Sequence, residues 1–504
     1  RARRETTTLD LQFEADDETA ANFHLVTAGG DGVPLQVLER ATLSEMEVNN
    51  WKTVQHVRVA VQAEAPGCGY RVLYALPGPA KPQPEIEAPV LALPQGMEND
   101  QLRVELRDDG TLDLLDKRTG RRFQGLAYLQ DDEDAGDEYD YSPAPHPKHI
   151  TTVGEPAEIR RTHAGPLQVT YEIRHTLELP ASLTPDRQQR SRARVHCPVT
   201  STVTLRADSA RVDVHTVVEN RARDHRLRLC FPTDLSTDDA SADGHFDVLT
   251  RPIDLTGAED WAQPPSPTRH QRTFVDLTDG DAGLAIFNRG LAEYEVLHDD
   301  GRNTLAVTLL RCVGYLSRDD LLTRDDHAGP EIATPEAQCL GTYAFDTAIA
   351  PHADDWHAIY HDAVDYRAPL TVRRGTEREG LIPTRAQMAA LDRPIRRTPV
   401  DLSGELPHAL SLVAVVPEET LVISAIKQSE DGEWLIVRLF NPLERLFEGK
   451  LQFAFPIEAA NMTNLREEPE RSLPMTDTNT VRLVLGPKRL QTVALKLESR
   501  RASG

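Results

Sequence analysis

The chain has 504 residues, 39% of them hydrophobic, and a formal net charge of -24 at pH 7. This length exceeds one simple core, so we expect about two to four globular domains. Nucleic acid is excluded as an expected partner, because its phosphates are bound by clustered Lys and Arg. No apolar run approaches the ~18 residues of a membrane span, and no apolar export signal follows Arg1. We therefore expect no membrane partner.

The number and spacing of the cysteines predict the cellular compartment of the protein. They are odd in number, far apart in the sequence and without a CxxC pair: Cys68, Cys197, Cys230, Cys312 and Cys339. This pattern favours neither a disulfide framework nor a zinc ribbon. We expect reduced thiols in a cytoplasmic protein, with Cys312 and Cys339 as small buried hydrophobic side chains.

The chain starts at Arg1 and runs directly into strand-like sequence. We expect it to be a piece of a longer polypeptide. A homo-oligomer is compatible with the sequence. The acidic surface fits either a GC-rich genome or adaptation to salt.

Apolar residues recur at every second position along much of the chain. Clear series are Leu167, Val169, Tyr171 and Ile173; Leu177 and Leu179; Val203 and Leu205; Val212 and Val214; Leu483 and Leu485; and Val493, Leu495 and Leu497. Period two indicates half-buried strands. Tight hairpins need a positive φ, which Asp-Gly supplies at Asp109-Gly110, Asp279-Gly280, Asp300-Gly301 and Asp431-Gly432. We therefore predict an all-β fold of several antiparallel β-sandwich domains.

One helix is predicted after Pro351, and proline-rich stretches suggest the domain boundaries. Its apolar face holds Trp356, Ile359, Tyr360, Ala363 and Val364, and Asp354 and Asp355 lie at its start, where the helix dipole favours acids. We expect this helix to close a domain. The predicted division is 1–90 as a small β-domain, 91–370 as a large β-sandwich, 371–410 as a linker and 411–504 as a small C-terminal β-sandwich.

A series of motifs covers nearly the whole chain. In order they are Pro66–Tyr70, Glu98–Leu106, Asp109–Leu112, Leu115–Gly120, Gly136–Pro143, Val218–Arg228, Arg311–Asp320, Pro335–Gly341, Ser424–Lys427 and Trp434–Asn441. Their order and spacing resemble the C-terminal β-region of glycoside hydrolase family 38, and the bacterial branch with the mannosylglycerate hydrolases is the nearest likeness. The resemblance implies a large central super-sandwich of the galactose-mutarotase type with smaller flanking β-domains.

The same resemblance implies a function for the whole protein. Members of the family are retaining α-mannosidases with an N-terminal catalytic barrel that holds one Zn²⁺ through two His and two Asp. The family's His-x-Asp-x-x-Trp and His-His-Asp motifs do not occur here, and His352–Trp356 approaches the first with a different Trp spacing. We therefore expect no catalytic residue and no metal ligand in this chain. Zinc and its ligands should lie outside it, and the expected partners are an α-mannoside and the missing catalytic domain.

Three residues are candidates for substrate binding by the same resemblance. Tyr139 aligns with a tyrosine that reaches the sugar, and core packing is its alternative. Arg311 or Arg318 lies where the family contributes an arginine near the substrate, since a guanidinium can hold sugar hydroxyls in fork geometry. A structural salt bridge is the alternative for both arginines.

Two polar stretches have a functional and a structural interpretation. The acidic run 131–138 resembles the clustered carboxylates of a calcium site, but its spacing is not that of an EF-hand, so we expect a solvated loop. In 220–227, Asp224 is placed to orient His225 or to pair with Arg226. A catalytic His–Asp pair there is one interpretation, and a structural hydrogen-bond network is the favoured one.

The preferred function is the C-terminal β-region of a retaining α-mannosidase-type hydrolase, which supports the catalytic barrel, helps to shape the mannose pocket and is inactive alone. The rival is a free-standing carbohydrate-binding or structural module that recognises sugar through exposed aromatics. Aromatics are only 5% of the residues, which favours the first. A third interpretation, a mutarotase-like epimerase, requires a His and carboxylate pair that no motif marks.

Overall fold

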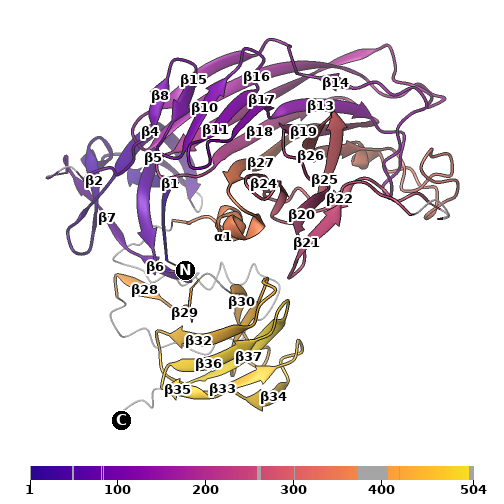
Figure 1. Cartoon of the computed structure of the whole chain (residues 1–504). Helices are drawn as coiled ribbons and strands as arrows, with labels where there is room; N and C mark the ends of the chain where they lie inside the picture. Colours follow the sequence, from indigo (N-terminus) through magenta and orange to yellow (C-terminus); the bar gives the residue numbers. More distant parts are fainter. Residues whose placement is uncertain are drawn as a thin grey trace. The chain divides into compact units, whose positions relative to one another are not determined.

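The computed structural model describes residues 2–47, 50–80, 82, 84–257, 261, 263–299, 301–372, 407–418 and 421–498. It divides into two compact units. The central unit is Ile86–Pro369, and the terminal unit is Arg1–Glu85 together with Leu370–Gly504. Both are built of antiparallel sheets, so the predicted all-β fold is confirmed (Figure 1). No helix among the described residues is long and apolar enough to cross a membrane.

The largest sheet of the central unit has nine strands. Its order is β15 (Glu158–Ala164), β16 (Gln168–Pro180), β17 (Arg194–Arg206), β18 (Val212–Asn220), β27 (Gly341–His352), β24 (Gly283–Asn288), β23 (Phe274–Thr278), β20 (Asp239–Asp243) and β21 (Val248–Pro252). The predicted alternation holds in β16, where Tyr171, Ile173 and Leu177 are buried.

Two further sheets complete the central unit. The six-stranded sheet has the order β14 (Ile150–Thr151), β13 (Tyr128–Glu133), β19 (His225–Thr233), β26 (Arg302–Cys312), β25 (Glu293–Asp299) and β22 (Arg269–His270). The five-stranded sheet has the order β12 (Arg122–Leu126), β11 (Leu112–Asp116), β10 (Leu102–Leu106), β9 (Gly96–Glu98) and β8 (Leu91–Leu93). One core cluster takes residues from all three sheets, for example Val104, Val203 and Leu305, so the sheets pack face to face.

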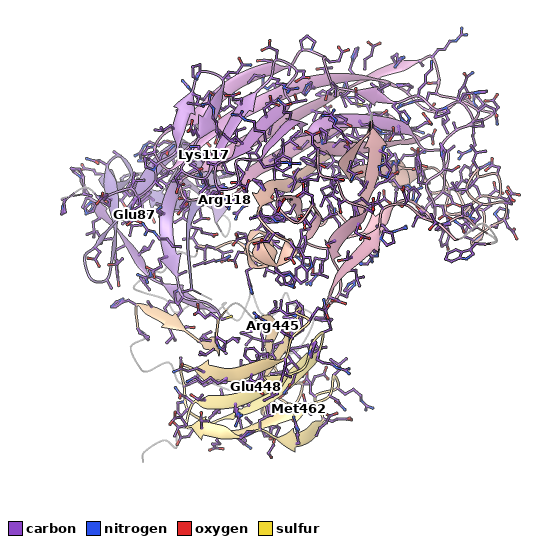
Figure 2. All side chains as sticks on the ribbon, in the orientation of Figure 1. Glu87, Lys117, Arg118, Arg445, Glu448 and Met462 are labelled. Carbon is purple, nitrogen blue, oxygen red and sulfur yellow. The ribbon has the colours of Figure 1, made fainter. Side chains whose placement is uncertain are left out.

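The motif Leu115–Gly120 forms the end of β11 and the turn to β12. Asp116 is fully buried, and Arg118 holds it with two donors, Nε at 2.8 Å and Nη2 at 3.1 Å. Arg118 also donates to the Pro351 carbonyl at 2.7 Å, and Lys117 donates to the Asn99 carbonyl. Figure 2 labels both basic residues at this turn. The motif therefore fixes local structure, because its charged groups hold segments that are distant in the sequence.

Three of the predicted Asp-Gly dipeptides lie in hairpins, and Gly301 of the fourth precedes β26. The three connect β10 to β11, β23 to β24, and β30 (Val422–Gln428) to β31 (Leu435–Phe440), and each of these pairs is antiparallel, as are β25 and β26. The four glycines have φ between 78° and 94°, which residues with a Cβ rarely adopt.

The predicted helix after Pro351 is present. It begins with the 3-10 turn η3 (Trp356–Ala358), where Asp355 accepts from the His357 amide at 2.9 Å, and continues as α1 (Tyr360–Arg367). The predicted apolar face is buried at Trp356, Ile359, Tyr360 and Ala363, and half-buried at Val364. Its rings meet β23 and β24 through the pairs Phe274–Tyr360 and Phe287–Tyr366.

Among its described residues, the terminal unit has five sheets of two to five strands. Their orders are β1 (Arg3–Glu14), β5 (Asn50–Ala65) and β4 (Leu35–Glu47); β3 (Gly32–Val33), β2 (Phe23–Thr27) and β7 (Leu73–Pro77); β28 (Ala409–Ser411) and β6 (Gly69–Arg71); β29 (Val413–Val416), β32 (Phe447–Phe453), β36 (Thr480–Leu485) and β35 (Met475–Asp477); and β30, β31, β37 (Leu490–Leu497), β33 (Ile457–Thr463) and β34 (Pro469–Ser472). A short 3-10 turn, η1, spans Glu18–Ala20.

The predicted four-segment division stays a prediction. Most of the linker that it placed at 371–410 lies outside the described residues. The last β-module resembles a sandwich, since β32, β36, β31 and β37 contribute to one core cluster with Leu451, Leu483, Val437 and Val493.

Candidate functional site

Tyr139 lies in the segment 134–143, here called the tyrosine loop, which is the first part of the connection from β13 to β14. Two side-chain carboxylates hold the shape of this loop by accepting hydrogen bonds from its own backbone amides. Asp134 accepts from the Gly136 amide at 2.8 Å, and Asp137 accepts from the amides of Tyr139 at 3.0 Å and Asp140 at 2.9 Å. Both are buried. The loop therefore has a defined shape set by its own side chains.

Arg311, at the end of β26, binds the tyrosine loop through its guanidinium group. Its Nε donates to Asp134 at 2.7 Å, and its Nη2 donates to the carbonyls of Asp137 and Asp140. Burial lowers the pKa of Arg311, but the charge and hydrogen bond of Asp134 outweigh it and raise the pKa above its usual value. The salt-bridge alternative is confirmed for Arg311. Its sugar contact stays a prediction and would use Nη1, which makes no hydrogen bond to the described residues.

Arg318 and Arg324 secure the same loop from the segment after β26. Asp137 accepts from the Arg318 amide at 2.8 Å, and Arg324 bridges Asp137 and Asp140. The Arg318 guanidinium forms a two-pronged pair with Asp320, at 2.7 and 2.8 Å, and its side chain is 16% exposed. The salt-bridge alternative is thus confirmed for Arg318 too, and its sugar contact stays a prediction.

The Tyr139 side chain projects from this fixed loop. The residue is 53% exposed, so the core-packing alternative is wrong. The hydroxyl end of the ring lies beside Gly329, where an added Cβ would be 2.9 Å from the phenolic oxygen. The Gly329 and Ala328 amides both donate to the buried Ser317 hydroxyl. The backbone beneath the phenol is therefore anchored, and the ring has a fixed support.

The acidic run is buried, which corrects the expectation of a solvated loop. Asp131, Asp132, Glu133, Asp134 and Asp137 are each at most 1% exposed. Their charges are met by basic side chains from other segments of the central unit. Asp131 pairs with Arg190, and Asp132 pairs with Arg228 at 2.7 Å and with His149. Burial raises the pKa of Asp132, but His149, Arg228 and Arg226 outweigh it and hold the pKa at about 2.

His225 does not pair with Asp224, so that predicted contact is wrong. Its Nδ1 meets Asp131 at 2.5 Å and its Nε2 meets Asn220 at 3.0 Å. Asp224 instead binds the Gln338 amide group at 2.7 Å, because a left-handed backbone at φ 52° turns it away from the strand. The predicted pairing of Asp224 with Arg226 is also wrong, since Arg226 lies 3.3 Å from Glu295. The favoured structural network is confirmed.

Sequence reasoning missed the basic partners Arg190, Arg228 and Arg324. One signal was present in β19, where Arg226 and Arg228 occupy alternate positions of a strand that is buried throughout. Two arginines on one face of a buried strand require carboxylates opposite them. Strand β13 supplies these carboxylates, because Asp132 lies across from Arg226 in the register.

The residues described here do not fit a zinc site. No group of three His, Cys, Asp or Glu side chains in the described ranges is placed to hold a metal ion. In the stretch that approaches the metal motif, His352 pairs with Asp276 at 2.8 Å and Asp355 caps η3. No chemical step of this chain is therefore derived through a metal.

Comparison with known proteins identifies the family. Residues 97–326 match the glycosyl hydrolases family 38 C-terminal domain, and residues 420–493 match the family 38 C-terminal beta sandwich domain. A Halalkalibacterium halodurans protein named "Putative mannosylglycerate hydrolase" is 28% identical over 414 residues, which are 79% of this chain and 41% of that protein.

Two solved structures from Enterococcus faecalis are similar over 98% of the chain. One is an alpha-mannosidase from strain V583, with 25% identity and a TM-score of 0.77, and 55% of its length is covered. The other is a glycosyl hydrolase family 38 protein with the same identity and TM-score, and 56% of it is covered. This chain thus spans about half the length of the proteins that it matches. By its motifs, its fold and these matches, the chain belongs to glycoside hydrolase family 38 and corresponds to its C-terminal β-region.

Proposed function

We propose that this chain forms the non-catalytic β-wall of a retaining hydrolase that cleaves α-mannosides. In this proposal it supports an N-terminal catalytic domain and completes the mannose pocket with the tyrosine loop. The nucleophile, the acid/base carboxylate and the zinc ligands belong to that catalytic domain. Family membership and the similarity to a mannosidase support the substrate class.

The observation that carries the pocket assignment is the contrast within the tyrosine loop. Its carboxylates are buried and paired, whereas the Tyr139 phenol is exposed on a loop held by Arg311, Arg318 and Arg324. A rigid amphipathic ring offers a sugar an apolar face and one hydroxyl at a low entropic cost. Arg318 is the second candidate donor, because its partly exposed guanidinium is held by Asp320.

The test uses Tyr139→Phe in the intact hydrolase. Loss of one neutral hydrogen bond costs about 0.5–1.5 kcal/mol, so kcat/KM for an α-mannoside should fall by roughly two- to twelve-fold with an unchanged melting temperature. Tyr141→Phe is the matched control. Tyr141 belongs to the same loop, but its ring lies under the Arg226 guanidinium at 3.6 Å, so that variant should keep its kcat/KM.

Gly329→Ala adds a second, steric test of the same pocket. The new methyl group would meet the Tyr139 ring, which must tilt, while the Gly329 backbone has no positive φ that would strain the variant. We expect a fall in kcat/KM that is absent in the Tyr139→Ala background. Unchanged kinetics in both Tyr139→Phe and Gly329→Ala would remove Tyr139 from the pocket.

A further inference from the structure

Cys312 and Cys339 lie side by side although they are far apart in the sequence. Cys312 ends β26 and is fully buried, and Cys339 follows the 3-10 turn η2 (Pro335–Gln338) and is half-buried. The Cys339 Sγ lies 3.9 Å from the carbonyl oxygen of Arg311, the residue before Cys312, and a thiol–thiol hydrogen bond shifts the pKa values of both cysteines. Asn220 holds both residues, because its Nδ2 lies 3.4 Å from the Cys312 Sγ and donates to the Cys339 carbonyl at 2.9 Å.

The backbone of Cys339 is strained. Its φ of 48° and ψ of 44° lie in the left-handed region, which side chains with a Cβ rarely occupy. Its amide donates to the Glu336 carbonyl at 3.0 Å, and its carbonyl is held by Asn220. These contacts hold Cys339 in this backbone conformation, and its Sγ lies 3.5 Å from the Ala337 carbonyl oxygen. Strain of this kind persists only where the surroundings impose it and is common at functional sites.

The pKa values of the two thiols are shifted in opposite directions. The hydrogen bond to Cys339, together with burial, raises the pKa of Cys312. The same hydrogen bond lowers the pKa of Cys339 to about 6, against the effect of burial and with help from His225 and Tyr343. In contrast, burial raises the pKa of Cys68 and of Cys197. A lowered pKa favours the Cys339 thiolate, which is the reactive form of a cysteine.

We propose that Cys339 and Cys312 form a peroxide-sensitive dithiol, in which Cys339 is the site of oxidation and Cys312 the resolving thiol. The Cys339 thiolate attacks a hydroperoxide, an S–O bond forms as the O–O bond breaks, and the leaving hydroxide or alkoxide takes a proton. The Cys312 sulfur then attacks the Cys339 sulfenic acid. An S–S bond forms, the S–O bond breaks, and the released hydroxide takes the Cys312 proton as water. The pair loses two electrons, which the peroxide gains.

Closing the disulfide needs only a local movement. The hydrogen bond between the thiols brings the sulfur atoms near each other, and an S–S bond of about 2 Å requires a closer approach. Cys312 is fixed in β26, opposite His225 in the register, so the Cys339 side is the one that moves. Cys339 ends a short turn, so this shift leaves the strand hydrogen bonds in place.

The first experiment treats the purified 504-residue chain with equimolar hydrogen peroxide at pH 7. Free thiols are then alkylated under denaturing conditions before tryptic digestion. Arg318 and Arg324 lie between the cysteines, so trypsin places Cys312 in peptide 312–318 and Cys339 in peptide 325–367. We expect these two peptides to be disulfide-linked, and the link to disappear with dithiothreitol. Oxidation that spreads evenly over the five cysteines, or no link between these two peptides, would overturn the proposal.

Substitutions assign the two roles. Cys312→Ser should block the disulfide and leave a Cys339 sulfenic acid that a 1,3-dione probe labels, whereas Cys339→Ser should abolish both products. Cys197→Ser is the matched control, because Cys197 is also buried in the central unit and should leave the link unchanged. Peroxide labelling of Cys312 in the Cys339→Ser variant would contradict the assignment.

A measurement on the unmodified protein does not depend on whether the variants fold. The alkylation rate of each cysteine by iodoacetamide is followed by mass spectrometry from pH 5 to 9. We expect Cys339 to react first and its rate to reach half of its maximum near pH 6. If Cys339 reacts no faster than the exposed Cys68 below pH 8, the proposal fails.

Discussion

Substitution of Arg311 tests whether this residue supports the tyrosine loop or only binds sugar. Arg311→Ala would leave the Asp134 carboxylate, whose side chain is fully buried, without its charge partner. Removing one member of a buried ion pair costs about 3–5 kcal/mol, so the urea midpoint of the chain should fall markedly. A residue that only contacted sugar would leave the midpoint unchanged. The control is Arg160→Ala. The Arg160 side chain is 60% exposed, and its ion pair with Glu172 stabilises the fold by about 0–1 kcal/mol.

The lowered pKa of Asp132 predicts how the free energy of unfolding depends on pH in the acidic range. Its pKa is about 2 in the folded chain and 3.8 in the reference state. As the pH falls, Asp132 is therefore protonated in the unfolded chain before it is protonated in the folded chain. The stabilisation by the Asp132 carboxylate is complete above pH 4 and is lost as the pH falls toward 2. The shift corresponds to about 2 kcal/mol. Asp132→Asn should have a lower stability at pH 7 and a shallower decline from pH 4 to 2 in urea titrations.

Asp254→Asn is the control for this titration, because the Asp254 side chain is 83% exposed and pairs with His298 at 3.2 Å. Its decline should match that of the unaltered chain. An Asp132→Asn variant with an unaltered slope between pH 4 and 2 would show that other carboxylates produce the acid transition.

Sequence reasoning proposed Tyr139, Arg311 and Arg318 as candidates but could not predict the ion-pair partners of the arginines. The type of a residue and its place in a local motif can be read from the sequence. Arg311 and Asp134, in contrast, are 177 positions apart, and Arg324 and Asp137 are 187 apart. Such pairs depend on which strands become neighbours. The run 131–138 was therefore expected in solvent, although arginines from elsewhere neutralise it.

The pair of strands β24 and β27 offers a test of packing at the level of an element. Gly283 lies opposite His352 in the register, and a Cβ at Gly283 would be 2.2 Å from the His352 ring. The ring is buried and bound to Asp276, so it cannot easily move. We expect Gly283→Ala to destabilise the central unit by about 3 kcal/mol or more in urea unfolding.

Gly244→Ala is the control for Gly283→Ala in the same unit. Its added Cβ meets its nearest atom, the Nε2 of His270, only at 3.4 Å, and its φ is not positive. The change should lie within about 0.5 kcal/mol. Equal effects of the two substitutions would mean that loss of glycine, and not the clash with His352, determines the result.

Strands, hairpins and the helix were predictable because each has a local cause. Alternating apolar residues define β16, an Asp-Gly turn defines the hairpin of β23 and β24, and the apolar face of α1 recurs at the helical period. The order of strands within a sheet has no such local signature. Nothing in residues 341–352 alone indicates that β27 separates β18 from β24.

For the whole molecule we predict that the purified, chelator-washed chain binds no stoichiometric zinc. Its 17 histidines provide no ligand set at metal-site spacing, and no group of three possible ligands converges in the described ranges. Metal analysis by mass spectrometry should find well below one zinc per chain. One tightly held zinc would place a metal site in this half of the family architecture.

The 504-residue chain alone should also hydrolyse no aryl α-mannoside. In our proposal the reacting carboxylates lie in the catalytic domain, and a retaining mechanism needs two of them about 5–5.5 Å apart on either side of the bond. Release of nitrophenol from an aryl α-mannoside is the measurement. Turnover that co-purifies with the chain and disappears on substitution of one of its own carboxylates would assign catalysis to this region.

The position of β27 also matters for synthesis on the ribosome. β18 ends at Asn220 and β24 spans Gly283–Asn288, and each pairs along one of its edges with β27, which ends at His352. Until that strand emerges, the nascent chain carries two half-sheets with open edges, which are templates for pairing with other chains. Translation at about 5–20 residues per second leaves these edges unpaired for several seconds. The nascent chain should therefore need protection by a chaperone during this interval.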